Sequence, residues 1–246
     1  MTKPRDLVHE LWSWERCRGG IRSLKGRLGF PNADMLKFLG LSLNTENGII
    51  HDELQDEGFK GSEVSVYFIL CGYAKAKLVP ETTRLVSFKQ LIGGQAYYKA
   101  FAERAIQPLA TTFGFKPQML IDASTLLGGI HQTHGEYSVK IYALPHVPLT
   151  IILWAETAEF PASADILFDS NANNYLTTEE LAGLAGLTSV RLKQAARVLE
   201  AKQQRVRSSK KGSLKKKRWE EFMAWVALTL VFSYVGRLSR LLLPQR

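Results

Sequence analysis

The stretch YSVKIYALPHVPLTIILWAETAEFPASADILFDSNANNYLTTEE, residues 137–180, decides the fold of this chain. Apolar and polar side chains alternate along 137–143 and along 149–154, which is the two-residue period of β-strands. Two prolines stand between these runs, and because proline donates no hydrogen bond to a sheet, we place the connection there. The stretch therefore predicts a β-hairpin with Ile151 and Leu153 facing the core, followed by a third short strand at 164–168.

Helices are predicted on both sides of this stretch, and they give the chain an α+β fold built on a small antiparallel sheet. The segment 64–76 is apolar on nearly every side, as in a helix buried within a core. Asn47-Gly48 stands between short alternating runs and predicts a second hairpin. Spacing and glycine boundaries predict four further helices: one through Leu7, Leu11 and Trp14 that ends before Gly19 and Gly20, a short one at 34–39, and longer ones at 96–113 and 116–127.

Four runs of sequence together resemble a known family. They are VSVYFILCGYAKA at 64–76, LVSFKQLIGGQAYYKAF at 85–101, PLTIILW at 148–154 and EFPASADILFDSNANNYLTTEEL at 159–181. The family is domain of unknown function 3786, from anaerobic bacteria and archaea, and the similarity covers roughly residues 35–192. It supplies no catalytic residues that could be transferred to this chain.

The resemblance implies a binding or accessory role in anaerobic metabolism. In the family the domain sometimes accompanies an iron–sulfur module like that of corrinoid proteins. This chain has only two cysteines, Cys17 and Cys71, so we expect no iron–sulfur cluster of its own, and its cofactor is unknown. Cys71 stands in an apolar run and is interpreted as a small buried hydrophobic residue.

Charge divides the chain into a neutral domain, 1–200, and a basic tail. Residues 201–218 hold nine Lys or Arg and no acid, and the rest of the chain has 23 basic and 23 acidic residues. We interpret 201–218 as a flexible polybasic linker and 219–246 as an apolar helix. A basic linker followed by an apolar helix predicts attachment to an anionic membrane surface. The predicted membrane-binding residues are Lys215, Lys216, Lys217, Arg218, Trp219, Phe222 and Trp225.

The predicted location is the cytoplasmic face of a membrane. The amino end carries charges throughout its first turns and no continuous apolar run, so we recognise no secretory signal. The run 222–235 is shorter than the about 20 residues of a comfortable membrane span. A short span, a helix in the membrane interface and a helix docked on the domain all fit it, and a protein partner is a further alternative.

Two alternative functions remain open from the sequence. The segment 178–199 has the pattern of a helix-turn-helix, with a glycine turn at Gly186 and Arg191 and Lys193 on the second helix, which would suit a DNA-binding regulator. Amphipathic helix pairs without DNA give the same pattern. The other alternative is an enzyme with a cavity near 154–180, around Trp154, Asp169 and Tyr175.

The candidate site residues follow from glycine, aromatic and carboxylate positions, and no catalytic residue is assigned. The predicted ligand-binding residues are Gly93, Gly94, Tyr97, Trp154, Asp169 and Tyr175. Carboxylates at Asp165, Asp169, Glu179 and Glu180 could act in acid–base chemistry, but a capping box of Thr177 and Glu180 explains the last of these more simply. His131, His134, Glu136 and His146 resemble metal-ligand spacing, but strand geometry keeps His146 away from the others, so no metal site is predicted.

Overall fold

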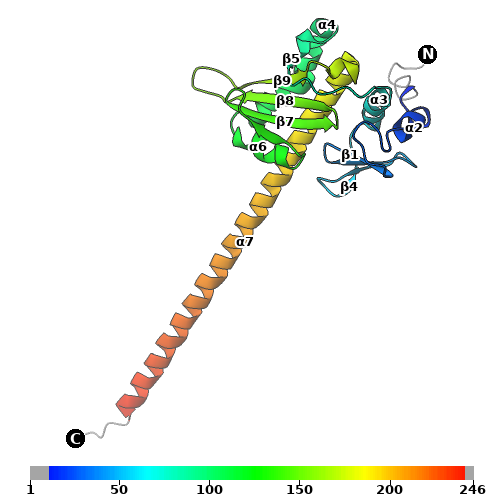
Figure 1. Ribbon diagram of the computed structural model, residues 1–246. Coiled ribbons are helices and arrows are strands. Elements are labelled where there is room, and N and C mark those ends of the chain that lie inside the picture. The colour runs from blue at the N-terminus through cyan, green and yellow to red at the C-terminus, as the bar shows by residue number, and fades with distance from the viewer. Residues whose placement is uncertain (1–10, 242–246) are drawn as a thin grey trace, which may run out of the picture. The chain divides into compact units, whose positions relative to one another are not determined.

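The computed structural model describes residues 11–241, and it describes side chains in this range except at 209–217 and 220–241. The chain divides into two units, Met1–Val198 and Leu199–Arg246. The first unit is the α+β fold that the sequence predicts, with helices and two antiparallel sheets (Figure 1).

The larger sheet has five strands in the order β5-β9-β8-β7-β6, and its centre is the predicted hairpin. Strand β7 (Tyr137–Leu144) pairs with β8 (Val147–Trp154), which pairs with β9 (Ser163–Asp169). The edge strands are β5 (Leu85–Ser87) and β6 (Ile130–Gln132). One detail of the prediction is wrong, since Pro148 lies within β8. The ladder tolerates it because the register shifts between Tyr142 and Leu144, beside the proline.

The smaller sheet has the order β1-β2-β3-β4, with β1 at Met35–Phe38, β2 at Leu41–Asn44, β3 at Ile50–Asp52 and β4 at Glu57–Gly58. The predicted hairpin at Asn47-Gly48 is confirmed as the turn between β2 and β3. The predicted helix at 34–39 is wrong, because this segment is strand β1. Leu39 and Gly40 have φ values of 49° and 67°, as in a two-residue hairpin turn, and Gly40 therefore ends a strand rather than a helix.

The helices agree with the prediction in the middle of the chain and differ near its amino end. Helix α3 (Glu63–Tyr73) is the predicted buried helix, and α6 (Gln118–Thr125) falls within the predicted 116–127 segment. The predicted helix at 96–113 is a continuous helical run of α4 (Gly94–Phe101), a π-helical segment (Ala102–Ile106) and α5 (Gln107–Phe113). Helix α2 (Trp14–Arg22) includes Gly19 and Gly20, so the prediction that it ends before them is wrong, and Leu7 lies outside the described residues.

Helix α7 (Thr178–Leu241) corrects two predictions. It continues without a turn through Gly183 and Gly186, so the predicted helix-turn-helix at 178–199 is one helix. Gly183 faces helix α3, where an added Cβ would lie 3.8 Å from Ile69, and this packing outweighs the intrinsic cost of glycine in a helix, about 1 kcal/mol. Residues 201–218 also belong to α7, so the flexible linker predicted there is helical.

The larger sheet has two unlike faces, which we call the closed face and the open face. The closed face carries Val139, Ile141, Leu149, Ile151, Leu153, Ile166 and Phe168, and each is 0 % exposed. Helices α5 and α6 pack against this side, and α6 lies behind the hairpin in Figure 1. The open face carries the intervening side chains, which include Tyr142 and Trp154 at 40 % exposure each. The predicted burial of Ile151 and Leu153 is confirmed.

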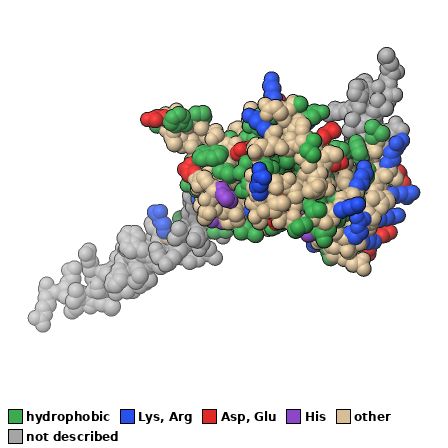
Figure 2. Space-filling model, turned by 45° about the horizontal axis from the view of Figure 1, so that its top comes forward, with side chains coloured by type: hydrophobic (Ala, Val, Ile, Leu, Met, Phe, Trp, Pro, Cys, Tyr) green, Lys and Arg blue, Asp and Glu red, His purple; other side chains and the backbone are tan. Residues whose placement is uncertain are grey.

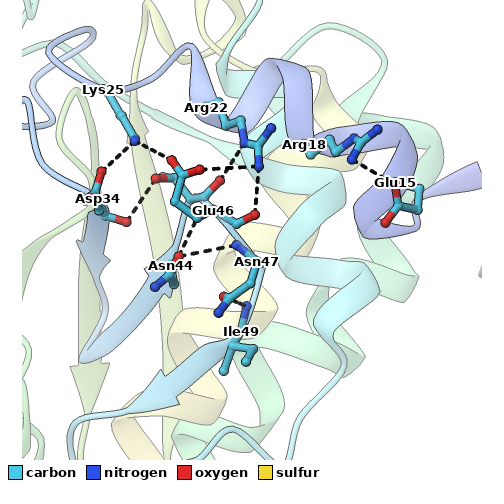
Figure 3. Close-up of polar contacts among 10 residues, drawn as sticks. Glu15, Arg18, Arg22, Lys25, Asp34, Asn44, Glu46, Asn47 and Ile49 are labelled. Carbon is cyan, nitrogen blue, oxygen red and sulfur yellow. Dashed lines mark hydrogen bonds and ion pairs between the residues drawn. The ribbon is translucent and has the colours of Figure 1, made fainter.

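Polar contacts connect α2 to the smaller sheet (Figure 3). The Arg22 guanidinium donates to the carbonyl oxygens of Thr45 at 2.9 Å and Glu46 at 2.7 Å. The Lys25 ammonium contacts carboxylates of Asp34 at 2.6 Å and Glu46 at 2.8 Å. These groups are largely exposed, so they fix where the β2–β3 turn lies more than they stabilise the fold.

Candidate functional site

The open face of the larger sheet is the candidate site, because polar and aromatic side chains gather there without a covering helix among the contacts described. Strand register places its residues in rows. One row runs from Lys140 on β7 through Thr150 on β8 to Leu167 on β9. The next row contains Ile152 opposite Asp165, and Trp154 follows at the end of β8. An added Cβ at Gly135 would lie 2.7 Å from Ile152, so the turn before β7 closes this end of the face.

Asp165 is the least satisfied carboxylate on this face. One of its oxygens accepts the backbone N–H of Ile166 at 2.8 Å. Among the described residues it forms no ion pair. Burial raises the pKa of Asp165 above its ordinary value, against the N–H of Ile166 and the charge of Lys89, which lower it. A carboxyl group with a raised pKa is a candidate for contact with a ligand. Tyr142 and Trp154 are the exposed side chains of this face, whereas Thr150 and Ile152 are 3 % and 7 % exposed.

Lys89 does not neutralise Asp165. Lys89 lies in the short 3-10 helix Phe88–Gln90 that follows β5, and its charge acts on Asp165. Its ammonium group, however, lies 4.1 Å from the ring centroid of Tyr98, in a cation–π contact. The positive charge is thus directed toward the aromatic ring, and Asp165 keeps one oxygen without a protein donor in the described part of the chain.

Lys140 and Thr150 provide the polar groups on the other side of the same face. Lys140 pairs with Glu81, whose second oxygen accepts the hydroxyl of Tyr142 at 3.0 Å. Desolvation lowers the pKa of Lys140, but Glu81 and Tyr142 outweigh it and raise the pKa overall. The hydroxyl of Thr150 has no hydrogen bond to a side chain or backbone group that the structure describes. Thr150 lies diagonally across the β8–β9 ladder from Asp165, at about 7 to 8 Å between Cα atoms, so a ligand on Asp165 would have to extend that far to reach its hydroxyl.

The segment 79–83 forms the boundary of the open face. It is held by Asp169, the last residue of β9, and by Asn171 and Tyr175, which follow it. Asp169 accepts the N–H of Thr82 at 3.0 Å, the N–H of Thr83 at 2.7 Å and the hydroxyl of Thr82 at 2.7 Å. Asn171 donates to the carbonyl oxygen of Pro80 at 2.7 Å, and Tyr175 bonds to both backbone groups of Val79. Burial raises the pKa of Asp169, but these donors and the N–H of Asn171 outweigh it, so the pKa is lowered.

The six predicted ligand-binding residues do not form one site. Asp169 and Tyr175 hold the same segment, and Tyr175 is buried against the rings of Tyr73 and His146. Trp154 stands beside Ser163, at the opposite end of β9 from Asp169, about 20 Å along the strand. By strand period Asp169 shares the face of Asp165, but it is 1 % exposed, so Trp154 is the only one of the six that is exposed on the open face. The cavity expected around Trp154, Asp169 and Tyr175 would have to bridge the length of β9.

The glycine pair lies at a turn fixed by the start of α7. Gly93 has a φ of 73°, and an added Cβ at Gly94 would lie 1.9 Å from the carbonyl oxygen of Phe88. The turn is tied to α7 because Asn173 accepts the N–H of Ile92 at 3.0 Å and Thr178 donates to its carbonyl oxygen at 2.6 Å. Tyr97 is 59 % exposed one turn further along α4. The arrangement gives Gly93 and Gly94 a packing role, and their ligand role stays a prediction.

The remaining candidates have structural partners. The capping box is confirmed, since Thr177 N–H donates to Glu180 at 2.8 Å and Glu180 N–H donates to the Thr177 hydroxyl at 3.3 Å. His146 lies at the β7–β8 turn with its ring stacked on Tyr175, whereas His134 lies near the start of β7. Within residues 11–241, no group of three or more His, Cys, Asp or Glu side chains is arranged to hold a metal ion.

Ion pairs occur elsewhere on the first unit, mainly around α2 and the smaller sheet. Figure 2 shows Lys and Arg gathered over the region of α2 and the smaller sheet, with acidic side chains between them. Arg191, which was predicted to face DNA, is fully buried and contacts Asp52 at 2.6 and 2.7 Å. Its role is therefore to join α7 to strand β3.

Sequence reasoning missed Lys140, Glu81, Tyr142 and Thr150 as members of one face. Lys140 and Thr150 stand at polar positions of the predicted hairpin. Aligning the alternating patterns of its two strands would have placed them opposite each other. Glu81 gave no such signal, because it reaches the sheet from a loop 59 residues before Lys140. Asp165 was noted among the carboxylates, but its lack of partners depends on tertiary structure.

The comparisons with known proteins identify a family and no activity. The family model described as Domain of unknown function (DUF3786) matches residues 33–191, which include both sheets and the start of α7. No curated protein matches the chain, and no solved structure matches it. In the described part of the chain, no helix is long and apolar enough to cross a membrane. Because the match covers more than half of its length, this chain belongs to the DUF3786 family.

Proposed function

We propose that the domain is a binding module, and that its ligand is a small organic cation held on the open face. The observation that carries this proposal is Asp165, a part-buried carboxylate with a raised pKa and one hydrogen bond, from its neighbour Ile166. A carboxylate that is desolvated without a partner is destabilised, and a cationic donor that binds it removes this cost. A ligand with an ammonium or guanidinium group therefore complements the face.

The surroundings of Asp165 suit a cation with an apolar body. Trp154 and Thr150 are its diagonal neighbours across the β8–β9 ladder, at distances of about 7 to 8 Å between Cα atoms. The Trp154 ring can contact a cation through its π face, and the part-exposed Leu167 offers apolar area on the same face. The Lys140–Glu81 pair is already neutral, so it sets an edge to the site without repelling a cation.

Binding of a simple probe tests the proposal. Benzylammonium carries one cationic group and one aromatic ring, and it should shift the amide NMR signals of residues around Asp165 and Trp154 in a saturable manner. Asp165→Asn should weaken binding by at least tenfold, whereas Asp122→Asn, on the exposed side of α6, should leave it unchanged. Equal binding by both variants, or shifts outside the open face, would refute the proposal.

We further propose that the second unit attaches the protein to an anionic membrane surface on the cytoplasmic side. Support comes from α7, whose residues 201–208 are exposed and carry Lys202, Arg205 and Arg207. The basic residues continue to Arg218 and precede an apolar run. Near an anionic leaflet each basic residue can contribute roughly 1 kcal/mol. The side chains of Lys215, Lys216, Lys217, Phe222 and Trp225 lie outside the described side chains, and their predicted membrane contacts stay predictions.

Vesicle sedimentation tests this attachment. Full-length protein should sediment with vesicles of phosphatidylserine and phosphatidylcholine, and not with phosphatidylcholine alone. Replacing Lys215, Lys216, Lys217 and Arg218 by Gln should release it at physiological salt. Protein that ignores both kinds of vesicle contradicts the proposal. Release by salt would indicate a helix in the interface, and release only by detergent would indicate a span.

An accessory role in anaerobic metabolism is supported by the family resemblance alone. Native mass spectrometry and absorption spectra of protein purified without oxygen would show a retained cofactor and its class. A bound cofactor that turns over a substrate would favour the enzyme alternative. Sequence-selective, salt-sensitive DNA binding that is lost with Lys193→Ala would restore the regulator alternative, with one continuous helix in place of the predicted pair.

A further inference from the structure

Helices α2 and α3 run side by side in parallel, with contacts at matching positions. The rings of Trp14 and Tyr67 have centroids 5.8 Å apart. Two turns further along both helices, the Cβ position of Gly20 lies 3.6 Å from Ala74 Cβ. Between these two contacts, three residues after Trp14 and four after Tyr67, stand Cys17 and Cys71. On one side of a helix, residues in contact with a neighbouring helix recur every three or four positions. Cys17 and Cys71 occupy the next such positions after Trp14 and Tyr67, so they face each other.

Direct contacts support the facing position of the two thiols. The Cβ position of Gly20 lies 3.7 Å from Cys71 Sγ, which places the Cys71 sulfur against α2. The two thiols are close enough to interact, since Cys71 raises the pKa of Cys17. Cys17 is 1 % exposed, whereas Cys71 is part-exposed, so an external reagent reaches Cys71 first. The reading of Cys71 as a simple buried hydrophobic residue is thus incomplete.

Glycine at position 20 brings the two helices close together. A disulfide requires Cα atoms about 4.4 to 6.8 Å apart, which is less than helices with large side chains at their contact usually allow. Gly20 has no side chain, and the side chains that face it on α3, Ala74 and Cys71, are small. The two helices can therefore approach closely at this point. Gly19, one position along, meets nothing within 4 Å and faces away. The glycine pair that was predicted to end α2 therefore has one member that serves the helix contact.

We propose that Cys17 and Cys71 are a redox-active pair that forms a reversible disulfide between α2 and α3, with hydrogen peroxide as oxidant. The Cys71 sulfur attacks one peroxide oxygen, the O–O bond breaks, and Cys71 becomes a sulfenic acid with release of one water. The Cys17 sulfur then attacks the Cys71 sulfur. The S–S bond forms, the S–O bond breaks, and the departing hydroxyl takes the Cys17 proton as a second water. A dithiol reductant reverses the reaction.

The environment of Cys17 fits the resolving role and not the attacking role. Burial and the neighbouring Cys71 raise the pKa of Cys17 to about 12, against a lowering effect of Lys75. A thiol that stays protonated is a poor first nucleophile, because the thiolate is the reactive form. Cys17 reacts only once Cys71 carries a leaving hydroxyl within reach.

Peptide mass spectrometry on full-length protein tests the pair. Treatment with stoichiometric hydrogen peroxide should join the peptides that contain Cys17 and Cys71, with loss of two hydrogens and of both free thiols, and dithiothreitol should restore them. Cys17→Ala should instead leave Cys71 as a sulfenic acid that a dimedone probe captures. Cys71→Ala should leave Cys17 unmodified. Thiols that stay free in the wild type, or disulfides only between two chains, would overturn the proposal.

Two leucine variants separate the helix contact from general effects on folding. Gly20→Leu inserts a side chain between the helices and should slow disulfide formation by tenfold or more. Gly19→Leu makes the same change one residue away, on the side without contacts, and should form the disulfide at the wild-type rate. Equal rates for the two variants would show that the thiols meet by unfolding and not through the α2–α3 contact.

Discussion

Two carboxylates on strand β9, four residues apart, have opposite environments. Asp169 is 1 % exposed and accepts hydrogen bonds from Thr82, Thr83 and Asn171, so its pKa is lowered. Asp165 accepts one backbone hydrogen bond and its pKa is raised. Burial raises the pKa of both carboxyl groups. The donors to Asp169 outweigh this effect, whereas the single N–H and the charge of Lys89 at Asp165 do not.

The comparison separates carboxylates that hold the fold from those free to bind. Asp52 follows the pattern of Asp169, because Arg191 donates to both of its oxygens and outweighs the effect of burial, so its pKa is lowered. Asp165 is the exception among these three. Asp52 and Asp169, whose oxygens accept several hydrogen bonds, stabilise the fold. Asp165 accepts only one, and we therefore place the ligand there.

The largest expected loss of stability comes from removing the partner of a buried, fully hydrogen-bonded carboxylate. Arg191→Met should lower the free energy of unfolding by about 3 to 5 kcal/mol, because it leaves the charge of Asp52 buried and unpaired. Denaturant unfolding measures the change. The double variant with Asp52→Leu should recover much of the loss, and no recovery would show that Arg191 acts through its other contacts with Leu39 and Gly40.

The two faces of the sheet should respond differently to the same truncation. Leu153→Ala on the closed face should cost about 2 to 5 kcal/mol of unfolding free energy, since its side chain is 0 % exposed. Leu167→Ala on the open face should cost clearly less, because Leu167 is only part-buried. Thermal or denaturant unfolding of the pair measures the difference. Equal losses would mean that the open face is covered by another part of the protein.

Asp169→Ala should destabilise the domain by about 2 to 3 kcal/mol, because its donors lose a charged acceptor. The sign of the pH dependence follows from a folded pKa below the unfolded one. The stabilisation is fully present above the unfolded value, about 3.9, and is lost as pH falls through the folded value. Unfolding measured from pH 7 to pH 3 should show the variant and wild type converging at the acid end. A constant difference would exclude an ionised Asp169.

The smallest expected effect on stability is that of Asp165→Asn, within about 1 kcal/mol of the wild type. A folded pKa above the unfolded one means that the wild type loses stability as pH rises from the ordinary carboxyl value through the raised one. The variant should therefore equal or exceed the wild type at pH 7 and lose that advantage in acid. Marked destabilisation at pH 7 would assign Asp165 to the architecture, like Asp169.

The sequence predicted the centre of the fold because local and tertiary preferences agree there. The 137–154 hairpin has strand period, strand-forming side chains and a proline-containing turn. Prediction failed in two different ways. At 34–39 the glycine after the segment was read as the end of a helix, whereas Leu39-Gly40 is the turn of a hairpin with β2. Gly183 stays helical because it packs on Ile69, a contact from far along the chain that leaves no mark in a short window.

The candidate site was predicted only in part, because of such distant contacts. Trp154 and Asp165 were recognised by residue type, but a carboxylate is distinguished by its donors, and those come from anywhere in the chain. Asp169 has donors 86 and 87 residues away, which no local pattern reveals. The segment that carries these donors also brings Glu81 to Lys140. The boundary of the open face is thus a tertiary property.

The carboxyl carbon signals of Asp165 and Asp169, followed by NMR through a pH titration of the folded protein, test the central comparison most directly. The account predicts that Asp165 titrates above the ordinary aspartate range and Asp169 below it, and that saturating benzylammonium lowers the pKa of Asp165 while leaving that of Asp169 unchanged. If Asp165 titrates at or below the ordinary value without a ligand, it is already satisfied within the protein, and the open face is not the binding site.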